Sequence, residues 1–204
     1  MKITILKSLI LLVFFLTWDS SISRAETPDV VVQKFQQQLL STMKEAKNLT
    51  VQQRYKILEP SVVSTFHMPL MTRIAAGDYW KQASKTQKTQ LIAAFRRMSI
   101  STLATLFRNY SGEKFKTLSA NKGPRQLQLI KTEMTRPNKN SIPITYISKK
   151  FSDRWYLIDV MVDSGISELK VRRSEFRGIL KSEGVSGLIR VLNKKADELV
   201  NPKQ

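Results

Sequence analysis

The sequence predicts an α+β domain in which several helices cover a curved, four-stranded antiparallel sheet. Between residues 27 and 109, apolar side chains recur at the spacing of about 3.6 residues that marks one face of a helix. Between residues 113 and 163 they mostly alternate with polar ones, as in strands, and after Gly165 the helical spacing returns. Helices segregated from a run of strands are typical of α+β domains.

The length of 204 residues is enough for one domain with a sizeable core, and no internal repeat or linker divides the chain. Its first 25 residues do not fit that domain: two lysines precede an apolar run over 9–16, and small residues stand at Ser23 and Ala25. This pattern is typical of a secretory signal peptide, so we expect cleavage after Ala25 and a single exported domain over 26–204. The alternative, an uncleaved membrane anchor, needs a longer apolar run, since about 20 residues span a bilayer.

The chain is strongly basic, with 34 lysine and arginine residues against 16 acidic ones and a net charge of +18. The first 25 residues hold three basic residues and one acidic residue, so the remaining domain keeps 18 − 2 = +16. A basic balance often indicates nucleic acid, but export separates the domain from nucleic acid and leaves anionic lipid surfaces as the expected partner. The chain has no cysteine, so burial of its core must stabilise it without disulfides.

Local signals place the first two helices. The residues Thr27, Pro28 and Asp29 form a compact helix start, which predicts a helix over 28–45. Thr50 and Gln53 form a capping box for a second helix, which we expect to end or kink at Pro60.

A segment dense in methionine and aromatic residues follows at 66–80. Pro and Gly interrupt it, which predicts short helical turns, and its adaptable side chains could line an apolar cavity or simply fill the core. His67 is the only histidine of the chain, so it is a poor candidate for a metal site or a catalytic triad. Ser84 and Gln87 then form a capping box for the longest helix, to about Asn109.

The strands are expected at 113–119, 126–135, 142–149 and 154–163. Short connections between them predict an antiparallel meander, and Pro143 requires a bulge or an edge position at that point. The fourth strand is apolar on both faces, which favours a central position under the helices. A helix from about Ile166 to Gly184 and a last helix before Pro202 complete the expected fold.

We find no residue pattern that indicates catalysis, a metal site or a cofactor. The acidic residues lie mostly beside lysine or arginine at helical spacing, and we expect ion pairs such as Glu168 with Arg172. Asp159 and Asp163 bracket the fourth strand without a histidine, cysteine or metal partner nearby in sequence. An exported basic domain without such chemistry is expected to be a binder or carrier and not an enzyme.

One cation stands out on the helix that follows the sheet. Arg173 projects into the apolar stripe between Ile166 and Leu180, and Arg177 flanks it. A guanidinium at the rim of an apolar surface can hold a phosphate with two hydrogen bonds, which predicts a contact to a lipid head group or a partner. The alternatives are an ion pair with an acid such as Asp163, or a stem that packs on the apolar surface while its charge stays in water.

Four segments of the chain read RYKILEP at 54–60, FHMPLMTRIAAGDYW at 66–80, AFRRM at 94–98, and WYLIDVMVDSGISELKVRRSEF at 155–176. Together they resemble the toluene-tolerance family, the MlaC group of exported phospholipid-binding carriers. The MPLMTR run and the SEL and RRSEF runs are most similar to the branch associated with hopanoid biosynthesis, HpnM. The resemblance covers essentially the whole domain after residue 25.

This resemblance implies a periplasmic lipid shuttle. Such a carrier holds lipid acyl chains in an apolar cavity between sheet and helices and exchanges them with an inner-membrane transporter or lipid-export complex, touching the membrane transiently. Its cargo would be a phospholipid, or a hopanoid in the second branch, and no cofactor is implied. The residues expected to line this cavity are Phe66, Met68, Met71, Ile74, Trp80, Phe95, Met98, Leu103, Tyr146, Leu157, Val160, Val162, Ile166 and Phe176.

A second hypothesis fits the same composition. A basic exported adaptor would dock on anionic membranes or on a partner complex through its surface, with its core filled by side chains and no lipid inside. The two hypotheses differ in one observable: a carrier purified from cells brings lipid with it, whereas an adaptor shows only salt-dependent binding to anionic vesicles.

Overall fold

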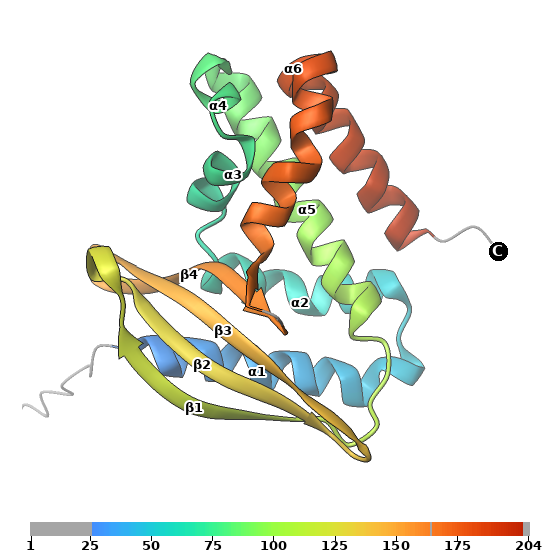
Figure 1. Cartoon of the computed structure of the whole chain (residues 1–204). Helices are drawn as coiled ribbons and strands as arrows, with labels where there is room; N and C mark the ends of the chain where they lie inside the picture. The colour runs from blue at the N-terminus through green and yellow to red at the C-terminus, as the bar shows by residue number, and fades with distance from the viewer. Residues whose placement is uncertain (1–25, 164, 202–204) are drawn as a thin grey trace, which may run out of the picture.

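The structure is a computed structural model that describes residues 26–163 and 165–201, so the predicted signal peptide lies outside the described residues. Its helices are α1 (Pro28–Glu45), the short 3₁₀ turn η1 (Ala46–Asn48), α2 (Val51–Thr65), α3 (Met68–Ala76), α4 (Tyr79–Gln82), α5 (Lys85–Leu106) and α6 (Glu168–Val200), with a second 3₁₀ turn, η2 (Pro124–Gln126), between two strands. In Figure 1, α1 runs along the sheet, and α3 to α6 stand above it. No helix in this part of the chain is long and apolar enough to cross a membrane.

The sheet confirms the predicted α+β class and the antiparallel meander, but the predicted number of four strands is wrong. Its strands are β1 (Lys114–Lys122), β2 (Gln128–Arg136), β3 (Lys139–Phe151), β4 (Arg154–Val162) and β5 (Ile166–Ser167). They follow one another in the order β1-β2-β3-β4-β5, and every neighbouring pair is antiparallel.

The fifth strand arises because the chain reverses before the helix starts. Asp163 and Gly165 both have positive φ angles, 55° and 75°, and the turn brings Ile166 opposite Val162. The helix expected from Ile166 therefore begins two residues later, at Glu168. A strand of two residues has no alternation of its own, so periodicity cannot reveal it.

The β4 strand is an interior strand under the helices, as expected: it lies between β3, the middle strand, and β5, and it packs against α1, α2, α3 and α6. The β4 strand pairs with β5 over two residues only, and the α2–α3 junction covers another part of its outer edge. There Phe66 forms a parallel bridge with Leu157, and the His67 amide donates to the Leu157 carbonyl at 2.9 Å. Leu157 is accordingly fully buried.

Pro143 lies on the part of β3 that extends beyond the end of β4. The last residue paired across this ladder is Ile144, opposite Val162. The Pro143 carbonyl accepts a hydrogen bond from the Asp163 amide at 2.9 Å. Because β4 has already ended here, the missing N–H of Pro143 removes no hydrogen bond between the two strands. Pro143 therefore has the predicted edge position on its β4 side, although β3 as a whole is the middle strand of the sheet.

Both predicted capping boxes are confirmed. The Gln53 amide donates to Thr50 Oγ1 at 3.2 Å and the Thr50 amide to Gln53 Oε1 at 2.8 Å, and Ser84 and Gln87 repeat the pattern. The helix α2 continues past Pro60 to Thr65. Leu58 and Val62, on either side of this proline, are fully buried, and their packing offsets the hydrogen bond that proline removes.

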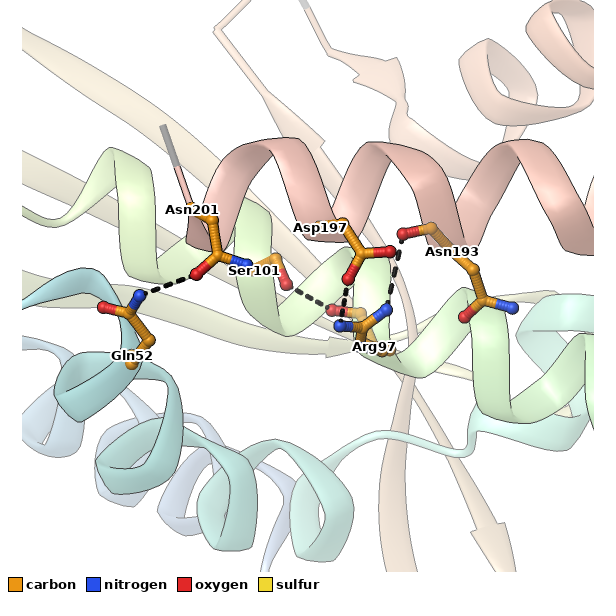
Figure 2. Close-up of polar contacts among 6 residues, drawn as sticks. All are labelled: Gln52, Arg97, Ser101, Asn193, Asp197 and Asn201. Atoms are coloured by element: carbon orange, nitrogen blue, oxygen red, sulfur yellow. Dashed lines mark hydrogen bonds and ion pairs between the residues drawn. The ribbon is translucent and has the colours of Figure 1, made fainter. Parts of the chain in front are cut away.

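Gly184 divides α6 into two antiparallel halves, as Figure 1 shows. Its backbone angles, φ 65° and ψ −164°, are outside the helical region, which confirms the predicted helix end. Polar contacts hold the second half against α2 and α5 (Figure 2): Arg97 donates to Asp197 Oδ1 at 2.6 Å, and Gln52 Nε2 to Asn201 Oδ1 at 2.9 Å.

Candidate functional site

An apolar pocket of about 380 Å³ lies on the sheet face that α1 covers in part. Alternate residues of β3, Ile142, Ile144 and Tyr146, form its floor, because every second side chain of a strand points to the same face. Their partners on the neighbouring strands continue the floor: Val162 lies opposite Ile144 and Val160 opposite Tyr146.

The helices supply the walls at helical spacing. Phe35 and Leu39 of α1 are four residues apart, and the junction of α2 with α3 adds two methionines, Met68 and Met71. The remaining wall comes from one face of α5 and the residue after it: Phe95, Ser99, Thr102, Leu103, Leu106 and Phe107.

The hydroxyl groups on the α5 wall are already bonded within the helix. Ser99 Oγ donates to the Phe95 carbonyl at 2.8 Å, and Thr102 Oγ1 donates to the Met98 carbonyl at 2.9 Å. Their hydrogens are therefore not available to a ligand, and the wall behaves as a mainly apolar surface.

A buried polar cluster supports the floor beside α1. Gln36 Nε2 donates to Thr132 Oγ1 at 3.2 Å and to the Tyr146 hydroxyl at 3.4 Å. Burial raises the pKa of Tyr146 to about 12, although the bond from Gln36 acts in the opposite direction. The phenol therefore stays neutral at physiological pH. Phe35 packs edge-on against both Phe66 and Tyr146, which fixes this end of the pocket.

Among the residues that the structure describes, the exposed Glu168 and the half-buried Arg172 are the only charged ones that line the pocket. The predicted ion pair between them is not the one that forms, because Arg172 Nη1 bonds Glu175 Oε2 at 2.8 Å. Leu106, which is 69% exposed, also lines the pocket. We call the rim of the pocket at Glu168 and Arg172 its mouth, because the Glu168 side of this rim is exposed.

The start of α6 at this mouth is held by Asp159 and Ser167. Asp159 Oδ1 accepts from the amides of Val160, at 2.8 Å, and Leu169, at 3.2 Å, and Asp159 Oδ2 accepts from the Ser167 hydroxyl. Ser167 Oγ in turn accepts from the Lys170 amide at 3.1 Å. These bonds satisfy amides at the start of the helix and fix its first turn on the sheet, which gives Asp159 a structural role.

Eight of the residues expected to line a cavity are brought together in this pocket: Phe66, Met68, Met71, Phe95, Leu103, Tyr146, Val160 and Val162. Six lie elsewhere. Met98, Leu157 and Phe176 are buried in the protein core, Ile74 and Ile166 are exposed, and Trp80 is half-buried with Lys88 Nζ 5.8 Å from the centroid of its ring.

The two arginines expected to contact a head group lie outside the pocket. The Arg173 guanidinium packs against Gly77, with Nε 3.2 Å from the position that a Cβ on Gly77 would take. Arg173 is exposed, and its guanidinium lies beside the turn that follows α3 and not in the pocket. Arg177 is exposed one turn further along. The pocket instead contains Arg172.

Several lining residues were not expected from the sequence, among them Phe35, Leu39, Met134, Ile142 and Ile144. The spacing of four between Phe35 and Leu39 and the alternation along β3 were available signals, but neither distinguishes a pocket from a core. Among residues 26–163 and 165–201, no group of three or more His, Cys, Asp or Glu side chains could hold a metal ion.

Comparison with known proteins agrees with this architecture. The model of the family described as MlaC protein matches residues 33–194. The comparison with curated proteins gave no match. Seven chains of solved structures match. One is the phospholipid-binding protein from Ralstonia solanacearum in complex with a phospholipid; it is 18% identical, has a TM-score of 0.75, and the match covers 86% of this chain and 100% of that one. At this identity the likeness shows a shared fold.

Proposed function

Because the chain belongs to the MlaC family, we propose that it is a periplasmic lipid carrier whose apolar pocket holds the acyl chains of a phospholipid. Membership of this family points to a binding or transport protein and not to an enzyme. The observation that carries the proposal is the pocket itself, which has an uncharged wall and floor and two charges confined to its mouth. The Ralstonia protein of the same fold, which holds a phospholipid, supports the choice of ligand.

The energetics of lipid transfer call for such an enclosure. Two chains of roughly 16 carbons, at about 0.8 kcal/mol per CH₂, cost on the order of 25 kcal/mol to expose to water. A volume of about 380 Å³ lies near the lower end of the range for ligand pockets, roughly 300–1,000 Å³. Met68 and Met71 are unbranched and change rotamer readily, so they can move aside to admit the second chain.

The carrier would work between membranes. The predicted signal peptide over 1–25 would export it to the periplasm, and an inner-membrane transporter or lipid-export complex would load or unload it. In the HpnM branch, which the MPLMTR run and the SEL and RRSEF runs resemble, the cargo would be a rigid polycyclic hopanoid in the same pocket. The net charge of 18 − 2 = +16 that remains without residues 1–25 favours brief contact with anionic membrane surfaces during exchange.

Native mass spectrometry of the exported protein tests this proposal. The full chain is expressed with its own N-terminal segment, purified from the periplasm without detergent, and its bound species are identified by lipid extraction. We expect a population of protein with one lipid bound per chain. Only lipid-free protein, together with salt-dependent binding to anionic vesicles, would instead support the alternative of a basic adaptor that carries no lipid.

A further inference from the structure

The two charged residues at the mouth of the pocket, Glu168 and Arg172, have opposite signs. Glu168 is exposed and Arg172 is half-buried, and they follow each other by four residues on α6. They therefore lie on one side of the helix, about 6 Å apart along its axis. Arg172 bonds Glu175 through one Nη atom, so the remaining N–H groups of its guanidinium can bond another anion.

The position of this pair is fixed by its surroundings. The bonds from Asp159 and Ser167 anchor the first turn of α6 to the sheet, and Leu169, between the two charges in sequence, is buried against the core. A ligand whose chains fill the pocket must therefore place its polar end beside Glu168 and Arg172.

The nearby cations do not complete an anion site. Lys170 is exposed and is absent from the pocket lining, and the guanidinium of Arg173 packs against Gly77 of the α3–α4 turn. The lining thus offers one cation and one anion, and the arrangement suits a ligand that also carries both charges.

We propose that this mouth selects lipids with a zwitterionic phosphoethanolamine head group, an inference that rests on the proposed carrier function. Arg172 bonds the phosphate, since a guanidinium matches its oxygens with two parallel hydrogen bonds. Glu168 accepts hydrogen bonds from the primary ammonium of the head group. A linker of two carbons joins this ammonium to the phosphate, so the two groups are close together. This separation is comparable to one helical turn.

Lipids with other head groups should bind less favourably beside Glu168 and Arg172. A phosphoglycerol head group satisfies Arg172 but leaves the Glu168 carboxylate beside a net negative ligand, which costs binding by like-charge repulsion. A neutral polycyclic lipid uses neither charge. Exposed ion pairs contribute up to about 1 kcal/mol, so we expect a preference of about three- to five-fold for the ethanolamine lipid over the glycerol lipid.

A competition experiment measures this preference. The full chain is stripped of lipid and incubated with vesicles that contain equal amounts of phosphatidylethanolamine and phosphatidylglycerol with identical acyl chains. Native mass spectrometry then gives the ratio of the two complexes. We expect the wild type to favour the ethanolamine lipid, Glu168→Gln to bring the ratio close to one, and Arg172→Gln to reduce loading of both phospholipids.

The variant Lys170→Gln is the matched control, since it changes a charge on the same turn outside the pocket and should leave the ratio unchanged. Thermal unfolding of each variant confirms that it folds. A wild-type ratio near one, or a ratio that Glu168→Gln leaves unaltered, overturns the head-group inference while the loaded lipid still supports the carrier. Absence of any bound lipid overturns the carrier proposal itself, and this inference with it.

Discussion

Filling the pocket from its floor should prevent lipid loading. Val160 lies on β4 opposite Tyr146, and its side chain lines the pocket. The substitution Val160→Trp places an indole where a ligand chain would lie, while Tyr146 and the polar cluster beneath it stay in place.

The expected loss follows from the area that the indole removes from the ligand. If it excludes about four methylene groups at about 0.8 kcal/mol each, binding weakens by about 3 kcal/mol, which is roughly 100-fold. The pocket of about 380 Å³ offers little space into which the chain could be displaced. Leu103→Trp, on the α5 wall of the pocket, should give a similar loss from the opposite side.

The assay compares lipid bound per protein after purification, by native mass spectrometry and by extraction. Leu118→Trp is the control, because Leu118 is a 52% exposed residue of the edge strand β1 and lies outside the pocket lining. We expect it to retain lipid. If Val160→Trp and Leu103→Trp fold and carry as much lipid as the control, the pocket is not the binding site and the reasoning fails.

Three further predictions concern the framework around the pocket. Gly77→Ala should destabilise the fold by about 1–3 kcal/mol, chiefly because Gly77 has φ 58°, and because the new Cβ would lie 3.2 Å from Nε of Arg173, which would have to shift. Gly178→Ala, which meets nothing within 4 Å, should not destabilise it, and urea unfolding measures both. Arg54→Met should cost about 2–4 kcal/mol in the same assay, since Arg54 is buried and donates to the carbonyls of Ala46, Leu49 and Ala104; a cost below about 1 kcal/mol would contradict this role. Burial raises the pKa of Tyr146 from 10.0 to about 12, so its contribution is fully present below pH 10 and is lost as the pH rises to about 12. Over that range the wild type should lose about 3 kcal/mol of stability relative to Tyr146→Phe, and parallel pH curves would contradict it.

Local sequence signals predicted the helices well because the relevant interactions span only a few residues. Thr50 with Gln53 and Ser84 with Gln87 form the bonds that their spacing indicates. The turn to β5 depends instead on the conformation of Asp163 and Gly165 and on pairing with β4. Tertiary packing also decides the course of α2, since buried neighbours carry the helix past Pro60.

The pocket shows where a hydrophobic pattern stops being informative. Met98 belongs to the apolar arc of α5 and is buried in the core, whereas Ser99 and Thr102, which are polar residue types, line the pocket. Their hydroxyls bond their own helix, so these residues present a mainly apolar surface. Arg173 illustrates the same limit: a helical wheel places it on a face of α6 but does not show that its guanidinium lies beside Gly77 and outside the pocket.

The most direct test of the account is to map where a lipid chain lies in the protein. A phospholipid with a photoreactive diazirine near the end of one acyl chain is loaded into the full chain, irradiated, and the labelled peptides are sequenced by mass spectrometry. The account predicts labels on pocket residues such as Phe66, Met71 and Leu103. Labels confined to exposed apolar residues such as Val63 and Leu118 would contradict it.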